Sequence, residues 1–333
     1  MSRIQNVANF EAVPSDSWPI EGVVSGLTVL WGAPGLGKSF VAVSMAASIA
    51  SGRPWIGRRT HEGRVVYVAG EGGGEAVARR LRAALKRWSV DVTESDLFPA
   101  DTVDLDVVTP GINLVAGPDE LKGLIGDRPP RLIIVDTLSR CFSGDENKQE
   151  FMGAFVRTLD ALRDHYGCAI LVIHHANRQA EMRGSSVLSG AVDVSWRLTK
   201  ARGPEGQSGP RLQMTADKLR ERDVEGASIC LQVEKVICTN ADGKPESDEF
   251  GDAQTSLVIK PPAELMRAAE RIRDAALPVL KVSGTITYTE WRALFPHLTK
   301  PEFDGALSLV ITYPGRWGIE QDIEEANCYW SKG

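Results

Sequence analysis

In three places in the first half of the chain an uninterrupted apolar run is followed by an amphipathic segment. The runs and their segments are 27–31 with 40–50, 65–69 with 75–88, and 132–135 with 151–166. The runs predict buried strands, and apolar residues spaced three and four apart predict helices. Another apolar run ends at His174 and His175. Because the runs do not alternate with polar residues, both of their faces should be buried, and we expect a mostly parallel sheet covered by helices.

Beyond residue 175 the apolar segments become shorter and more alternating. Four segments have this character and are separated by polar, glycine-rich joints: 192–200, 211–220, 227–238 and 255–260. Alternation with such joints predicts antiparallel hairpins that extend the sheet. We therefore expect an α/β core domain over residues 20–260, preceded by a short amino-terminal arm over residues 1–19.

Two prolines, Pro261 and Pro262, mark the start of a small carboxy-terminal domain over residues 261–333. Its pattern predicts a helix, a short strand, two short helices and a final hairpin, which is the order of a winged-helix-like domain. This segment holds eight basic and ten acidic residues. That balance does not support a role in reading DNA, so packing or docking of a protein partner is the favoured interpretation.

Composition excludes several classes of protein. The 333 residues are 43% hydrophobic and 25% charged, which is typical of a globular chain and not of a disordered or collagen-like one. No apolar stretch reaches the length of a membrane span, and the start of the chain lacks the apolar region of a secretion signal. The five cysteines are scattered without a C-x-x-C pair, so we expect a cytoplasmic protein without a disulfide framework.

A glycine-rich loop between the first predicted strand and helix carries the strongest chemical signal. It reads Gly32, Ala33, Pro34, Gly35, Leu36, Gly37, Lys38, Ser39, and Phe40 follows it. This sequence fits G-x-x-x-x-G-K-[ST], a loop whose backbone N–H groups surround nucleotide phosphates. Lys38 is expected to reach the β- and γ-phosphates and the Ser39 hydroxyl to bind Mg²⁺, so ATP and Mg²⁺ are the predicted ligands.

Polar residues at the ends of other predicted strands supply the remaining chemistry. Asp136 closes the run 132–135 and is the candidate for a second magnesium anchor. Glu71 follows the run 65–69 and is the candidate general base, with Glu75 one helical turn further on as the alternative. Either His174 or His175 could sense the γ-phosphate, but adjacent side chains on a strand point to opposite faces, so only one can do so.

These segments together resemble the RecA-like ATPases, and specifically the RepA-like branch related to DnaB-type hexameric replicative helicases. The resemblance rests on GAPGLGKS, YVAGEG, LIIVDTLSR, ILVIHHANR and RGSSVLSGAVD, and covers about residues 19–260. It implies that Glu71 is the catalytic base and His175 the sensor. It also implies that Arg220 acts as an arginine finger with Lys218 as its companion, both offered to the nucleotide of a neighbouring subunit in a homohexamer.

The resemblance further implies that single-stranded DNA passes through the ring along two loops, 138–147 and 176–190. The second loop contains Arg178 and Arg183, which are the candidate DNA contacts. Neither loop is strongly basic, and an interface or surface role for the two arginines is the alternative.

The resemblance implies an ATP-driven ring helicase or translocase of plasmid or phage replication, with a possible replication protein bound through the carboxy-terminal domain. A second interpretation is a regulatory or loading ATPase that acts on a protein partner through the same residues. A third, a small-molecule kinase, is disfavoured because no substrate lid is evident after the phosphate-binding loop.

Overall fold

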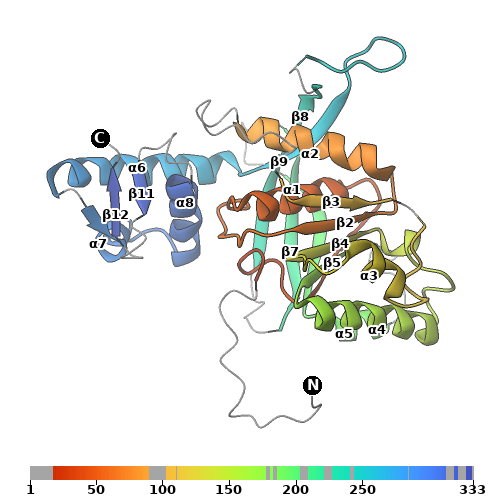
Figure 1. The fold of residues 1–333 in the computed structure, drawn as a ribbon. Helices are drawn as coiled ribbons and strands as arrows, with labels where there is room; N and C mark the ends of the chain where they lie inside the picture. Colours follow the sequence, from red (N-terminus) through yellow and green to blue (C-terminus); the bar gives the residue numbers. More distant parts are fainter. Residues whose placement is uncertain are drawn as a thin grey trace, which may run out of the picture.

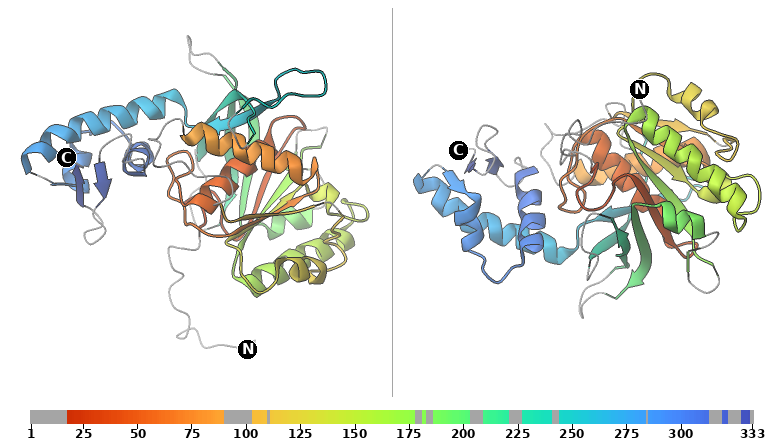
Figure 2. Two further views of the ribbon diagram at one scale, coloured as in Figure 1. Left: turned by 45° about the horizontal axis from the view of Figure 1, so that its top comes forward. Right: turned by 90° about the horizontal axis from the view of Figure 1, so that it is seen from below.

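A computed structural model describes most of the chain. The described residues are 18–89, 103–109, 111–177, 181–182, 186–202, 209–220, 227–240, 244–283, 285–312, 319–321 and 328–331. They form a large α/β unit and a smaller carboxy-terminal unit, which lies to one side of it in every view (Figures 1 and 2).

A nine-stranded sheet forms the centre of the larger unit, in the order β3-β2-β4-β5-β1-β6-β7-β8-β9. Its strands are β1 (Leu27–Gly32), β2 (Val65–Ala69), β3 (Leu105–Val108), β4 (Leu132–Asp136), β5 (Ala169–His175), β6 (Val194–Ala201), β7 (Arg211–Leu219), β8 (Ser228–Ile237) and β9 (Thr255–Lys260). In this order, each neighbouring pair from β3 through β2, β4, β5 and β1 to β6 is parallel. The pairs β6–β7, β7–β8 and β8–β9 are antiparallel. The predicted large, mostly parallel sheet of a mixed α/β fold is confirmed.

Helices cover both faces of the parallel half of the sheet (Figure 1). They are α1 (Lys38–Ser51), α2 (Gly73–Ser89), α3 (Asp119–Ile125), α4 (Gln149–Tyr166) and α5 (Ser186–Ala191). One apolar core joins α1 and α2 to the sheet, and a second joins α3, α4 and α5 to the opposite face. Every residue of β1, β2 and β4 is buried, which explains why these segments lack polar alternation.

Three elements differ from the sequence prediction. The stretch between α2 and β4 contains several prolines, and it holds a strand, β3, and a helix, α3, that the hydrophobic pattern did not predict. Strand β3 lies at the sheet edge and is only partly buried, so its sequence carries a weak apolar signal. The predicted loop 176–190 is wrong at its end, because residues from Ser186 onward form α5 and pack Leu188 into the core.

The carboxy-terminal unit has a hydrophobic core of its own. It comprises α6 (Ala263–Ser283), β10 (Thr285–Thr287), α7 (Tyr288–Ala293), α8 (Lys300–Thr312), β11 (Ile319–Gln321) and β12 (Cys328–Ser331). Trp291 and Phe303 are fully buried at the centre of this core. The order of elements is the one predicted, and its assignment to the winged-helix type stays a prediction.

An ion pair and a close backbone approach are among the contacts between the described parts of the two units. The Arg211 guanidinium on β7 forms an ion pair with the Glu264 carboxylate on α6, with Nη1 2.7 Å from Oε1 and Nη2 3.1 Å from Oε2. The Arg211 side chain is only 4% exposed. The backbone of Gly57 abuts Gly305 of α8 so closely that a Cβ on Gly57 would lie 2.3 Å from the Gly305 carbonyl oxygen. Substitution of Gly57 would therefore disturb this junction.

Candidate functional site

The glycine-rich loop connects the carboxyl end of β1 to the start of α1. Gly37 is the residue that caps α1, and its φ of 88° lies in the left-handed region that glycine adopts without strain. A Cβ on Gly32 would lie 2.6 Å from the Leu198 carbonyl oxygen on the neighbouring strand. The two glycines therefore allow the chain to turn tightly and bring the N–H groups at the start of α1 to the mouth of the loop, where anions bind.

Lys38 folds back across this loop. Its Nζ donates to the carbonyl oxygens of Gly32 and Ala33, at 3.0 and 2.9 Å, and lies 3.2 Å from His175 Nδ1. Burial lowers the pKa of Lys38, while the nearby Asp136 and Glu71 carboxylates oppose that shift. The ammonium group thus lies among the residues predicted to surround the γ-phosphate.

Asp136, at the end of β4, is a fully buried carboxylate. The Tyr67 hydroxyl donates to Asp136 Oδ2 at 2.6 Å, whereas Asp136 Oδ1 has no hydrogen-bond partner within the described residues. Burial raises the pKa of Asp136, and the hydroxyls of Tyr67 and Ser39 act in the opposite direction. An unsatisfied buried carboxylate oxygen beside Ser39 is a suitable ligand for a cation.

Glu71 lies two residues after the end of β2 and is hydrogen-bonded to the end of β4. The backbone N–H groups of Gly70 and Glu71 both donate to the Asp136 carbonyl oxygen, at 2.7 and 3.2 Å. The Thr137 hydroxyl donates to Glu71 Oε1 at 3.1 Å, and Arg140 Nε lies 3.9 Å from the same oxygen. The predicted base and the predicted magnesium anchor are therefore neighbours. The alternative, Glu75, lies in the first turn of α2.

The two histidines at the end of β5 have different environments. His174 is buried, with 1% of its surface exposed. His175 pairs in register with Gly32 of β1, and its Nε2 lies 3.7 Å from Glu71 Oε1. Because the Lys38 ammonium can only donate, His175 Nδ1 acts as an acceptor, and a neutral ring then carries its proton on Nε2, facing Glu71. His175, the second of the pair, is thus the histidine in contact with the predicted site.

Arg80 on α2 belongs to the same cluster and was missed by sequence reasoning. Its guanidinium stacks on the Phe40 ring, 4.8 Å from the ring centroid, and a Cβ on Gly72 would lie 3.9 Å from Arg80 Nη2. Burial raises the pKa of Asp136, and the positive charge of Arg80 opposes that rise. Because α2 carries several arginines at similar spacing, nothing in the sequence distinguishes this one.

Lys218 and Arg220 lie where the parallel strands β1 and β6 begin, whereas the loop lies where β1 ends. We call these two sides of the sheet its amino edge and its carboxyl edge. Leu219 pairs with Val194 at the start of β6, and β1 and β6 are parallel. Arg220 bonds to Asp193, which bonds to Leu27 at the start of β1. The five residue steps from Leu27 to Gly32 therefore separate Arg220 from the loop along the strand, roughly 16 Å at about 3.3 Å per residue. Lys218 Nζ donates to the carbonyl oxygens of Ser189 and Gly190. The structure does not bring this pair to the chain's own loop.

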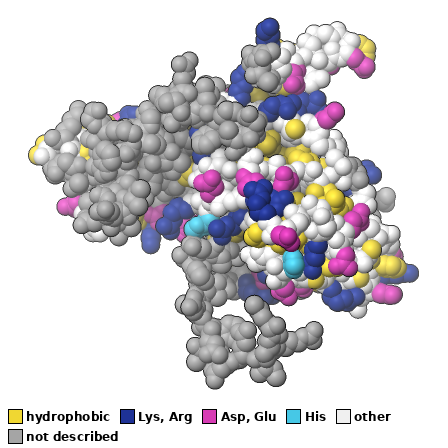
Figure 3. All heavy atoms as spheres, viewed as in Figure 1, with side chains coloured by type: hydrophobic (Ala, Val, Ile, Leu, Met, Phe, Trp, Pro, Cys, Tyr) yellow, Lys and Arg dark blue, Asp and Glu magenta, His cyan; other side chains and the backbone are white. Residues whose placement is uncertain are grey.

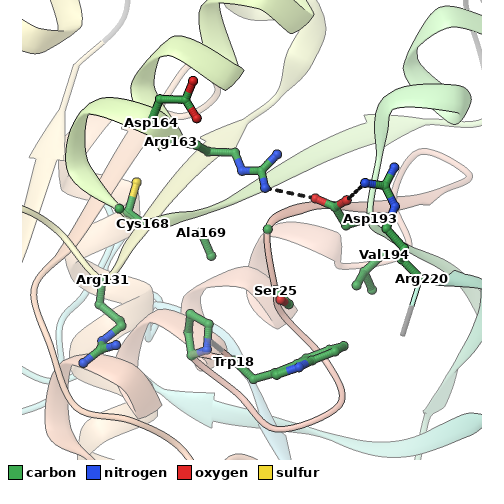
Figure 4. A pocket seen from close by; sticks show the side chains of 13 residues that line it. Trp18, Ser25, Arg131, Arg163, Asp164, Cys168, Ala169, Asp193, Val194 and Arg220 are labelled. Carbon is green, nitrogen blue, oxygen red and sulfur yellow. Dashed lines mark ion pairs between the residues drawn. The ribbon is translucent and has the colours of Figure 1, made fainter. Parts of the chain in front are cut away.

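Arg220 borders a cavity of about 440 Å³ at this edge (Figure 4). Its Nη1 lies 2.8 Å from Asp193 Oδ1, and Arg163 Nη2 lies 3.1 Å from Asp193 Oδ2. The Leu27 N–H also donates to Asp193 Oδ2, at 2.8 Å. One carboxylate therefore holds two arginines and the start of β1.

The candidate DNA contacts, Arg178 and Arg183, lie outside the described residues. The first candidate loop is described: residues 138–140 form a short 3-10 helix, η5 (Leu138–Arg140), directly after Asp136 and Thr137. On the face shown in Figure 3, basic and acidic side chains are interspersed over the described core.

The residues around the loop fit a nucleotide triphosphate bound with Mg²⁺. A Cβ on Gly35 would meet nothing within 4 Å, so the top of the loop is open. The buried, unsatisfied Asp136 Oδ1 offers an acidic ligand, and Lys38 occupies the loop by bonding to its carbonyl oxygens. Ser39 and Asp136 would hold the metal ion, which would neutralise phosphate charge.

The sequence model of the AAA_25 family, described as AAA domain, matches residues 5–181, just over half of the chain. The chain belongs to the AAA_25 family. It is a RecA-like P-loop ATPase, and a P-loop ATPase binds nucleotide, generally with Mg²⁺. The matched residues of this AAA domain include the loop, Glu71, Asp136 and His175.

This AAA domain protein is also similar to the DNA repair protein RadA of Chlamydia muridarum, with 26% identity over 239 residues. The alignment covers 66% of this chain and 45% of RadA, so the chain spans less than half the length of that relative. Within the described residues, none of the helices has the length and hydrophobicity that crossing a bilayer requires.

Proposed function

We propose that this chain is an ATP-driven, ring-forming DNA translocase or helicase that hydrolyses ATP at the interface between two copies. Lys38, Ser39 and Asp136 hold the magnesium-bound triphosphate in one copy. Glu71 accepts a proton from the attacking water. Arg220 of the next copy stabilises charge on the γ-phosphate, a contribution of about 10³–10⁵ in rate for arginine fingers.

The position of Arg220 carries this proposal. Glu71, Asp136 and His175 gather with Lys38 at the carboxyl edge of the sheet, so the catalytic carboxylate and the metal site belong to one copy. Arg220 is exposed at the amino edge, 58% by side-chain surface, where it cannot serve its own nucleotide. A second copy that presents this edge to the loop would complete the site, and repeated head-to-tail pairing of this kind forms a ring when the rotation between copies closes.

The proposed coupling to DNA uses the loops that follow β4 and β5. Loss of the γ-phosphate would change the surroundings of Lys38 and His175, which are 3.2 Å apart. His175 directly precedes residues 176–185 of the predicted loop, so the change could move Arg178 and Arg183 against a single strand. The similarity to a protein named for DNA repair supports DNA as the polymer. A homohexamer and a replication partner at the carboxy-terminal unit are part of the same proposal.

ATP turnover per subunit, measured against protein concentration with and without single-stranded oligonucleotide, tests the proposal. We expect turnover to rise with concentration as copies assemble and to increase further with DNA. Glu71→Gln should bind nucleotide but stop hydrolysis, and Glu75→Gln, on the adjacent first turn of α2, is the matched control that should keep turnover. Turnover that ignores DNA but responds to a protein partner would instead favour a regulatory ATPase.

A further inference from the structure

A threonine hydroxyl holds the carboxylate of Glu71. Thr137 follows Asp136 directly, and its side chain is buried, whereas the Glu71 side chain is 39% exposed. Thr137 Oγ1 donates to Glu71 Oε1 at 3.1 Å. An exposed glutamate loses rotamer freedom when a buried, fixed donor binds one of its oxygens. Thr137 is therefore placed to restrict the orientation of the carboxylate.

The backbone around this pair is fixed as well. The N–H groups of Gly70 and Glu71 donate to the Asp136 carbonyl oxygen, so the turn after β2 is bonded to the end of β4. Thr137 is the residue that follows this carbonyl group, just beyond the end of β4. The backbone of both Thr137 and Glu71 is consequently fixed by these two backbone hydrogen bonds. The Thr137–Glu71 hydrogen bond then sets the orientation of the side chains.

The held carboxylate faces the phosphate-binding loop. Glu71 Oε1 lies 3.7 Å from His175 Nε2, and the other ring nitrogen of His175 lies 3.2 Å from Lys38 Nζ. The His175 ring therefore lies between the Glu71 carboxylate and Lys38, the lysine that contacts the γ-phosphate in P-loop enzymes. The hydroxyl bonds one carboxylate oxygen, Oε1.

We propose that Thr137 is a positioning residue for Glu71: its hydroxyl orients the general base toward the γ-phosphate. This inference rests on the proposed function, in which Glu71 is the base. Thr137 Oγ1 also lies 3.0 Å from Ser139 Oγ, in the candidate DNA loop 138–147. The same hydroxyl thus connects the base to a loop that is proposed to contact the strand.

Thr137→Val removes the hydroxyl while keeping the shape of the side chain. A hydrogen bond to a charged group contributes about 1.5–3 kcal/mol, which corresponds to a loss of about 10–160-fold in kcat. The KM for ATP should stay within about twofold, because the change affects the base and not phosphate binding. Thr137→Ser, which retains the hydroxyl, should recover most of the lost kcat. A purely structural role would not separate kcat from KM in this way.

Thr28→Val is the matched control, since it removes a buried hydroxyl that bonds the Ser25 carbonyl oxygen at the amino end of β1. It should leave kcat unchanged. In a Glu71→Gln background Thr137→Val should cause no further loss, because the group it orients is gone. If Thr137→Val unfolds, Thr137→Ala removes the same hydroxyl and is assayed in its place.

The two possible failures give different results. If Glu71→Gln keeps full turnover, the base is wrongly assigned and the proposed site fails. If Glu71→Gln stops turnover while Thr137→Val matches or exceeds the wild-type kcat, the role of Thr137 is refuted and the base assignment stands.

Discussion

Replacing Asp136 by asparagine should make the ligand-free protein more stable. The Asp136 side chain is fully buried, receives one hydrogen bond from Tyr67, and has one oxygen without a hydrogen-bond partner in the described part of the chain. Burial raises the pKa of Asp136, which means that the folded protein opposes the ionised form. A neutral amide of the same size removes this conflict and can still accept the Tyr67 hydrogen bond.

The expected size follows from the buried charge. Each unit by which burial raises the pKa of a carboxyl group corresponds to about 1.4 kcal/mol against the ionised form, and for a domain of about 200 residues each kcal/mol shifts Tm by about 2–4 °C. Asp136→Asn should therefore raise Tm by several degrees at pH 7.5. A carboxyl group whose folded pKa is raised loses stability as pH rises from its unfolded pKa through its folded pKa. The difference in Tm between Asp136→Asn and the wild type should accordingly shrink as pH falls through the range between the folded and unfolded pKa of Asp136.

Thermal unfolding in a chelating buffer without nucleotide measures this effect. Asp160→Asn on α4, an exposed carboxylate, is the control and should change Tm by only about 1 °C. Mg-ATP should stabilise the wild type and not Asp136→Asn. A lower Tm for ligand-free Asp136→Asn than for the wild type would refute the argument that this carboxylate is kept for metal binding at the expense of stability.

Two further substitutions test the loop and the junction between the units. Lys38→Ala should abolish the increase in Tm that Mg-ATP gives the wild type, and an unchanged increase would remove Lys38 from the binding site. Glu264→Gln should lower the free energy of unfolding by about 1–3 kcal/mol at pH 7, because it weakens the pair with buried Arg211. Arg211 lowers the pKa of Glu264, so this contribution is present above the unfolded pKa of 4.5 and is lost as pH falls through the folded pKa. Urea unfolding at pH 7 and at pH 4 measures the difference, and equal stability of both proteins at pH 7 would contradict it.

Continuous apolar runs made the parallel half of the sheet predictable. Strands β1, β2 and β4 are buried on both faces, and the motif at residues 32–39 requires a strand before it and a helix after it. The edge strand β3 and the seven-residue helix α3 have too little buried surface for a clear pattern. The order of the strands also escaped prediction, because it depends on pairing between distant segments.

The residues of the candidate site likewise fall into those that the sequence could predict and those that it could not. Residues that end buried strands, such as Asp136 and His175, could be selected from sequence because the carboxyl ends of parallel strands meet at one edge. Arg80 and Thr137 could not, since one is among several arginines of an amphipathic helix and the other is a small residue after a strand. Their proximity to Asp136 and Glu71 arises only from tertiary packing. The catalytic roles of all these residues stay predictions.

The most direct test of the central claim is a subunit-mixing assay. Lys38→Ala subunits should lack a working nucleotide site, and Arg220→Ala subunits should bind ATP without the finger for a neighbour. When the two variants are mixed, Arg220 of a Lys38→Ala copy can reach the nucleotide bound in the intact loop of an Arg220→Ala copy. We predict that the mixture recovers ATP turnover that neither variant shows alone. A mixture no more active than the separate variants, although the two assemble, would contradict a site completed by a second copy.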